Sequence, residues 1–212
     1  MAFDLTAFRS QLQYDGARPN LFEVILIPPT SIVGATLAGQ KIRFFCHTAQ
    51  IPGNSIGEIP VYYFGRTINV PGNKVFQPWV VTIQNDEDFA IRNVMERWSA
   101  AINSHESNVR RAGFLSPSQY GVNGAVIQYS KLGTGVQLRQ GPNAPGGGNT
   151  LSGATGIRKY NFIGLWPADV SPIDVSWSAN DQIEEFVVTF SVQWWEVERE
   201  PDAGLRSKVS VG

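Results

Sequence analysis

Few residues in this chain have the types and spacing that enzyme chemistry requires. The single cysteine, Cys46, is followed directly by His47, a pair that would supply a nucleophile and a general base if the side chains could meet. They lie in an apolar run that we expect to be a strand, where adjacent side chains point to opposite faces. Cys46 could instead meet the second histidine, His105, but a buried structural cysteine is the simpler interpretation. The sequence therefore does not favour a catalytic thiol.

The other chemical candidates also have simpler explanations. Two well-separated histidines and one cysteine give no spacing typical of a metal site. The three carboxylates at 86–88 suit the first turn of a helix better than an acid and base pair. The segment 153–159 lacks the Lys-Ser/Thr pair that ends a phosphate-binding loop. We therefore expect no enzyme, no metal and no cofactor.

The composition is low in charge and rich in aromatic residues. Charged residues make up 17% of the 212 residues, where a soluble domain typically has about 25%. Interface cores show the same depletion of charge, although an ordinary aromatic-rich β core would also explain it. The net charge of -1 argues against tight DNA binding that ignores sequence, because such binding needs a basic surface.

Three features that the sequence lacks bear on where the protein is made: a disulfide framework, a signal peptide and a membrane helix. One cysteine cannot form an intrachain disulfide, which fits a reducing compartment. The N-terminus lacks the basic and apolar regions of a signal peptide, and the apolar runs are shorter than the ~20 residues of a membrane helix. We expect a protein made in a cytoplasm, with no membrane-spanning segment.

Most of the chain has the two-residue hydrophobic period of β-strands. The runs rich in β-branched and aromatic residues predict strands at 20–28, 41–47, 59–64, 66–70, 79–84, 125–130 and 159–165. Gly65 separates two of these strands, and Pro71-Gly72-Asn73 is expected to end the second.

The clearest strand is predicted at 183–197. Alternation places Phe186, Val188, Phe190, Val192 and Trp194 on one face and Glu185, Thr189, Ser191 and Gln193 on the other. This pattern predicts one buried face and one polar face. At ~3.3 Å per residue the strand would be roughly 45 Å long, which suits the wall of a larger assembly.

One segment predicts a helix. Asn85 is a candidate N-cap, and the carboxylates at 86–88 would complement the helix dipole. Apolar residues then recur at helical steps, at Ile91, Val94, Met95, Trp98 and Ile102. We expect a helix over 86–103 whose apolar stripe packs on a sheet.

We expect one domain over residues 1–212. Residues 133–156, with three consecutive glycines, predict a long surface loop. A linker between two domains is less favoured, because strong strands on both sides resemble parts of one sheet. The polar residues 201–212 predict a mobile tail.

Three sequence blocks, in order, resemble the tail tube protein family of contractile-tailed bacteriophages. They are 17–24 (ARPNLFEV), 44–98 (with AQIPGNSIGEIPVYYFGRTINVPG and WVVTIQNDEDFAIRNVMERW) and 164–196 (GLWPADVSPIDVSWSANDQIEEFVVTFSVQWWE), and they cover over half of the chain. The resemblance implies a mainly β fold with one flanking helix, as a small β-barrel or two packed antiparallel sheets.

The resemblance also implies a structural subunit that assembles with itself. Family members form hexameric rings that stack into a tube, and the implied location is the virion tail after synthesis in the host bacterial cytoplasm. The implied partners are further copies of the chain, the tail sheath protein, baseplate and tail terminator proteins, and DNA that passes through the lumen without tight binding. Because this fold also occurs in the tubes of bacterial secretion systems, the interpretation as a phage protein depends on the three sequence blocks.

Two sets of contact residues follow from the resemblance. In the family, the segment after the second strand reaches the neighbouring ring, and here it corresponds to 49–70. The expected inter-ring residues are Ile51, Pro52, Ile59, Pro60, Tyr62, Tyr63 and Phe64, although they could instead be local hairpin residues. The polar face of the longest strand predicts lumen-facing residues Thr189, Ser191 and Gln193, with the 86–103 helix outside.

Two alternatives remain at this point. A carbohydrate- or surface-binding β module would be a stable monomer whose tryptophan fluorescence is quenched by a saccharide. A tube-capping or baseplate tube subunit would form rings that do not polymerise.

Overall fold

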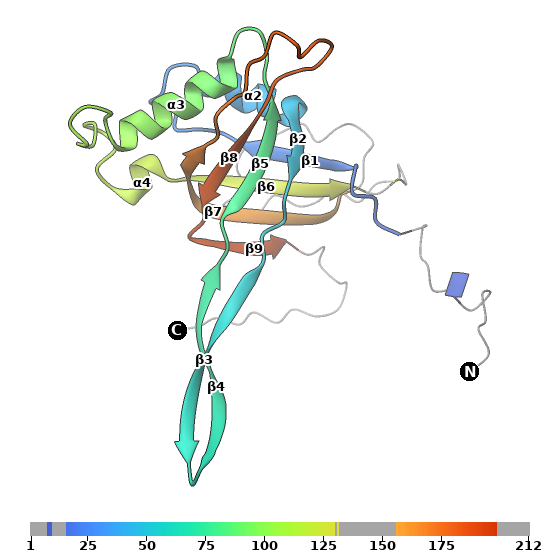
Figure 1. Cartoon of the computed structure of the whole chain (residues 1–212), viewed down its shortest axis with the longest axis vertical. Coiled ribbons are helices and arrows are strands. Elements are labelled where there is room, and N and C mark those ends of the chain that lie inside the picture. Colours follow the sequence, from blue (N-terminus) through green and yellow to red (C-terminus); the bar gives the residue numbers. More distant parts are fainter. Residues whose placement is uncertain (1–7, 10–15, 130, 132–155, 199–212) are drawn as a thin grey trace.

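The computed structural model describes residues 8–9, 16–129, 131 and 156–198 (Figure 1). Two sheet halves and their helices form a body from which a long hairpin projects (Figure 1). The predicted 133–156 loop lies outside the described residues except for Gly156, and the predicted 201–212 tail lies wholly outside them.

Seven antiparallel strands form the body in the order β1-β6-β7-β8-β5-β2, with β9 also paired to β7. Their bounds are β1 Phe22–Leu26, β2 Cys46–Ala49, β5 Trp79–Gln84, β6 Val122–Tyr129, β7 Gly156–Val170, β8 Glu185–Ser191 and β9 Trp194–Glu198. The other two strands, β3 (Asn54–Tyr63) and β4 (Arg66–Phe76), form the projecting hairpin. The mainly β class with two sheets is confirmed.

Strand β7 belongs to both halves of the seven-stranded sheet. One half contains β1, β6 and β9, and the other contains β8, β5 and β2. Its first part pairs with β6 and β9, and its second part pairs with β8. Between them Gly164 has a φ of 69°, which glycine adopts without strain, and an added Cβ would lie 2.5 Å from Cγ of Gln193. Across the core, the stacked rings of Trp79 and Phe162 join the two halves with centroids 4.6 Å apart. The bend at Gly164 therefore lets one sheet close over its own core.

The single strand predicted at 183–197 is two strands in the structure. Both β8 and β9 run antiparallel to β7, but the pairing is interrupted at 192–193, and the alternation reverses there. The core positions of β8 are buried as expected, at Phe186, Val188 and Phe190. Trp194 was predicted on the same face and is instead 49% exposed, while Trp195 packs against the core.

The prediction of a strand at 41–47 is wrong for residues 41–45 and correct for residues 46–47. Residues Ala35–Phe45 form helix α2, and the strand β2 begins only at Cys46. The buried positions of α2, Ala35, Ala38 and Ile42, recur at helical steps. The body therefore carries a second helix beside the one flanking helix that was expected.

Helix α3 (Ala90–Ile102) confirms the predicted apolar stripe, because Ile91, Val94, Met95, Trp98 and Ile102 are all buried. The short helix α4 (Pro117–Tyr120) lies beside it, and Nε1 of Trp98 donates a hydrogen bond to the carbonyl oxygen of Tyr120 at 3.0 Å. Trp98 also contacts the ring of Phe190, so α3 covers the core face of β8.

The start of α3 differs from the prediction. Asn85 is not the N-cap, because 86–88 form a turn before the helix and Asp88 accepts a hydrogen bond from the backbone N–H of Ala90 at 3.0 Å. Nζ of Lys41, on α2, lies 2.5 Å from carboxylate oxygens of both Asp86 and Asp88. These hydrogen bonds raise the pKa of Lys41 and lower that of Asp88. The carboxylates thus join the two helices.

Buried charges hold the outer strands in place. Glu23 of β1 accepts hydrogen bonds from Arg43 of α2 and from the hydroxyl of Tyr129 of β6. Burial, followed by the bond to Glu23, raises the pKa of Tyr129 above its ordinary value. Lys159 of β7 pairs with Glu198 of β9 at 3.0 Å. Removing one partner would leave a buried charge uncompensated, which is strongly destabilising.

No helix in the described ranges has both the length and the apolar character needed to cross a membrane.

The two faces of β8 predict a contrast in stability between neighbouring positions. Phe190→Ala should lower the free energy of unfolding by about 3–5 kcal/mol, because it leaves a cavity against Trp79 and Trp98. Thr189→Ala, on the half-buried opposite face, should cost less than about 1 kcal/mol. Urea unfolding of the two variants measures the difference, and equal losses would contradict the assignment of faces.

Candidate assembly interface

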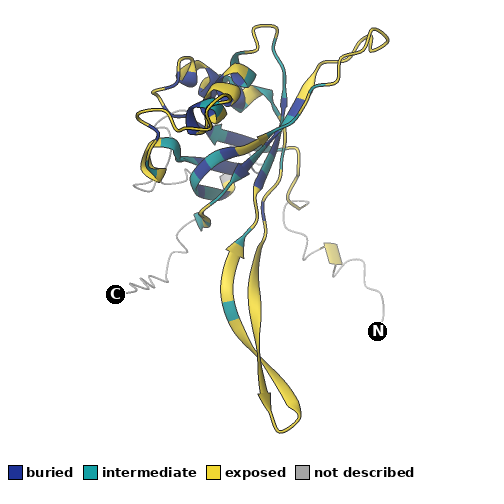
Figure 2. Cartoon of the chain, turned by 60° about the vertical axis from the view of Figure 1, so that its left-hand side comes forward, coloured by how far each residue is buried: buried dark blue, intermediate teal, exposed yellow. Residues whose placement is uncertain are grey.

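The hairpin of β3 and β4 is a separate two-stranded sheet (Figure 1). Its residues are almost all exposed, in contrast to the body (Figure 2). The 71–73 segment, predicted to end the second strand, lies within β4. Since an isolated two-stranded hairpin is at best marginally stable in water, a hairpin of this length indicates a partner surface.

The hairpin continues the β2–β5 pair of the body. Two backbone hydrogen bonds join the two chain segments between the body and the hairpin, at a segment that we call the neck. Gln50 N–H donates to Val80 O at 3.0 Å, and Gln77 N–H donates to Gly53 O at 3.2 Å. The hairpin is therefore held in line with strands of the core sheet.

The turn at the hairpin tip has two residues with positive φ, Phe64 at 45° and Gly65 at 76°. Two-residue hairpin turns of this kind favour Asn-Gly or Gly-Gly, so phenylalanine at the first position is strained. Phe64 is also 89% exposed, and its ring contacts that of Tyr63 with centroids 4.6 Å apart. A strained, exposed aromatic residue at a tip is typical of a contact site.

One face of the hairpin is apolar. The register pairs Ile59 with Val70 and Val61 with Ile68, and Tyr63 follows on the same side. These five side chains, here called the apolar hairpin face, are between 42% and 66% exposed. An exposed apolar stripe of this kind marks a site of association.

The predicted inter-ring residues are distributed over several surfaces. Ile59 and Tyr63 belong to the apolar hairpin face, whereas Pro60 and Tyr62 lie on the opposite face, across from Asn69 and Thr67. Phe64 forms the tip, and Ile51 is exposed near the neck. Pro52 is buried within the chain, which removes it from the proposed contact set.

Sequence reasoning missed Val61, Ile68 and Val70. The signal was present in the sequence, since Ile59, Val61 and Tyr63 alternate before the turn, and Ile68 and Val70 alternate after it. Pairing the two runs about Gly65 would have placed all five on one face.

The predicted lumen residues are not one continuous row. Thr189 and Ser191 are half-buried on the face of β8 that points away from the core, and Thr189 pairs with Val80 of β5. Gln193 lies beyond the end of β8, where its side chain packs over Gly164. Helix α3 covers the other face of the same sheet, as described above.

The chemical candidates remain separate in the structure. Burial raises the pKa of the Cys46 thiol to about 12, and its Sγ donates to Thr48 O at 3.4 Å. His47 instead lies with Nδ1 2.6 Å from Oε1 of Glu185. Among the residues that the structure describes, no group of three or more His, Cys, Asp or Glu side chains is arranged to hold a metal. This arrangement offers no activated nucleophile at Cys46.

A family model and two curated relatives all match phage tail tube proteins. The family model described as "Phage tail tube protein" matches residues 17–198. The chain is 29% identical to tail tube protein gp19 of Enterobacteria phage T4 over 182 residues, which cover 86% of this chain and 92% of the relative. The corresponding protein of Enterobacteria phage T6 is 28% identical with the same coverage.

Two solved structures share the fold. One is the tube terminating cap of the anti-feeding prophage, with a TM-score of 0.57, 12% identity, and coverage of 94% of this chain and 100% of the other. The second is the sheath/tube terminator of the extracellular contractile injection system PVC, with a TM-score of 0.53, 9% identity, and coverage of 86% and 96%.

Adjacent hairpin residues with opposite orientations provide a matched test of this interface. Ile68→Lys places a charge on the apolar hairpin face and should abolish association between copies. Asn69→Lys, on the opposite face, should leave association nearly unchanged. Both variants should unfold within about 0.5 kcal/mol of the parent chain, because the hairpin lies outside the core. Sedimentation velocity and thermal unfolding measure the two effects, and equal association of both variants would argue against the interface.

Proposed function

The chain belongs to the phage tail tube protein family and is a structural subunit of a tail tube, and from this membership we propose that it assembles into stacked hexameric rings through which DNA enters the host. The observation that carries the stacking is the apolar hairpin face, because it projects from the body and the described residues leave it exposed. The proposed role is structural rather than enzymatic.

Free sheet edges support closure into a ring. The β2–β5–β8 half of the body ends on one side at β2, whose one partner among the described strands is β5. On its other side, residues 166–170 of β7 pair with β8. Joining β2 of one copy to this part of β7 in the next would pair exposed backbone groups that otherwise favour aggregation. A closed ring removes both edges at once.

The proposed lumen is the polar face of β8 and its neighbours. Thr189 and Ser191 lie on the face opposite α3, so placing them inside the ring puts α3 on the outside. The proposed wall includes Gln193, which is exposed beyond the end of β8. The net charge of -1 suits a wall along which DNA slides, because the 17 Lys and Arg side chains are balanced by 18 Asp and Glu side chains and give no net attraction for phosphates.

The proposed partners follow from a tube position. A tail sheath protein would contact the outer surface that includes α3, and baseplate and tail terminator proteins would contact the two ends of the stack. Synthesis in the host bacterial cytoplasm, before assembly into the virion tail, completes the proposal.

Negative-stain electron microscopy across a protein concentration series tests the assembly. We expect six-fold rings and hollow rods of the purified chain, with or without a baseplate seed. Rings that never elongate would identify a capping or baseplate subunit. Monomers at every concentration, even with a seed, would overturn the proposal and favour the carbohydrate- or surface-binding module, which saccharide quenching of tryptophan fluorescence would then detect.

Charge at the proposed lumen provides a test of function after assembly. A chain with Thr189→Arg, Ser191→Arg and Gln193→Arg should still form tubes but release DNA poorly, because the added cations bind phosphates. Tubes are counted by microscopy and DNA ejection by infectivity of phage assembled with the variant. Normal infectivity of particles containing the variant would show that these residues do not line the lumen.

A further inference from the structure

A second exposed apolar cluster lies at the opposite end of the molecule from the hairpin. The 171–184 connection between β7 and β8, orange-red at the top of Figure 1, carries Val175, Trp177 and Ile183. Trp177 is completely exposed, and the other two are more than two-thirds exposed. The connection lies at the end away from the hairpin in both views (Figures 1 and 2). Within the described chain, nothing accounts for an uncovered tryptophan at this end.

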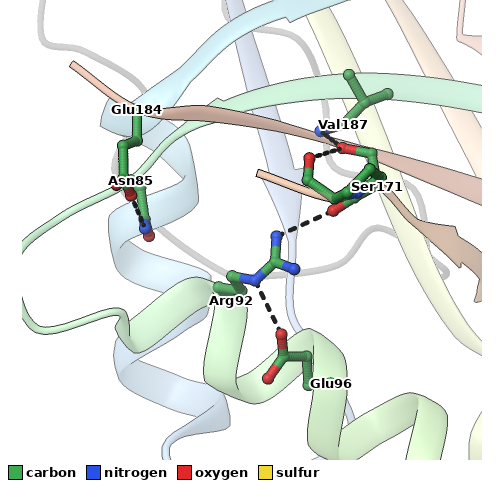
Figure 3. A network of polar contacts seen from close by, with 7 residues as sticks. Asn85, Arg92, Glu96, Ser171, Glu184 and Val187 are labelled. Carbon is green, nitrogen blue, oxygen red and sulfur yellow. Dashed lines mark hydrogen bonds and ion pairs between the residues drawn. The ribbon is translucent and has the colours of Figure 1, made fainter. Parts of the chain in front are cut away.

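Both ends of this connection are held by polar contacts (Figure 3). At its start, Ser171 Oγ accepts a hydrogen bond from Val187 N–H at 2.8 Å, and Arg92 Nη1 donates to Ser171 O at 3.0 Å. At its end, Asn85 Nδ2 donates to Glu184 Oε2 at 3.1 Å, and Asn85 N–H donates to Glu184 O at 2.8 Å. The connection is therefore fixed to the body, and we call residues 171–184 the apolar platform.

The platform and the hairpin tip have complementary charge. The platform contains Asp174, Asp181 and Glu184 and has no lysine or arginine. The tip carries Arg66 directly after the turn, paired with Tyr63. Opposite charges at the two ends favour a contact between unlike ends and disfavour a contact between two platforms.

Growth of a stack requires this kind of asymmetry. A contact between identical patches closes a two-fold pair and stops, whereas a contact between two different patches leaves a free patch at each end and can repeat. The hairpin tip and the platform are different, lie at opposite ends and are both aromatic. They therefore have the arrangement that an open stack needs.

We propose that the hairpin tip of one copy docks on the apolar platform of a second copy in the adjacent ring, with Tyr63 and Phe64 covering Trp177 and with Arg66 near the platform carboxylates. This inference rests on the proposed tube function and names the surface that receives the hairpin. The edge-to-face packing of Tyr63 and Phe64 leaves ring faces available for a third aromatic residue.

Site-specific cross-linking between copies tests the contact. In a Cys46→Ser background, one preparation carries Phe64→Cys and another carries Trp177→Cys. The two are mixed, assembled and treated with a short bismaleimide, and covalent dimers are measured by denaturing electrophoresis. We expect at least about tenfold more 64–177 dimer than with the Val109→Cys control, because juxtaposed thiols react at an elevated effective concentration. Val109 is 62% exposed and lies outside both surfaces.

A second pair keeps the aromatic residues intact. Thr67→Cys and Ser178→Cys flank the proposed contact, so they should cross-link in the same way even if the first pair weakens assembly. Rods that yield no cross-link with either pair, or only 64–64 and 177–177 products, would overturn the inference while leaving the tube function standing. Failure of the unsubstituted chain to assemble at any concentration would overturn both.

Discussion

The backbone hydrogen bonding of β7 is the constraint on which the rest of this subunit depends. One 15-residue strand pairs with β6, β9 and β8, and it can do so only because it bends at Gly164, where a side chain would collide with Gln193. The bend brings the two sheet halves together over the aromatic core around Trp79. Helices α2 and α3 then cover that core, and Lys41 joins them. The opposite face of β8, which no helix of the described chain covers, is left for another role.

The sequence predicted the parts of this fold that depend on local pattern. The strand at Trp79–Gln84, the turn at Gly65 and the apolar stripe of α3 are all present, because alternation, glycine and helical spacing act over short distances. Helix α2 was missed because its last four residues include Ile42, Phe44 and Phe45, which are the β-branched and aromatic types that favour strands. Tertiary burial of Ala35, Ala38 and Ile42 selects the helix.

The remaining differences come from long-range pairing. The apolar alternation continues from β8 to Trp194, so the interruption at 192–193 is visible only through pairing with the bent β7. The apolar hairpin face likewise appears only when β3 and β4 are set in register, and the burial of Pro52 depends on packing beyond the hairpin. Sequence pattern thus identified the segment that carries the candidate interface, but the face presented to a partner depends on register.

The alignment of the hairpin with the core sheet has a mechanical consequence. The hairpin extends the β2–β5 pair along the longest axis of the molecule (Figure 1). A thrust applied along that axis acts parallel to the strands and perpendicular to their interstrand hydrogen bonds. The bonds between β2, β5 and β8 are then sheared together instead of being unzipped one after another. The β2–β5–β8 half of each subunit is consequently suited to transmit force along the axis of its hairpin.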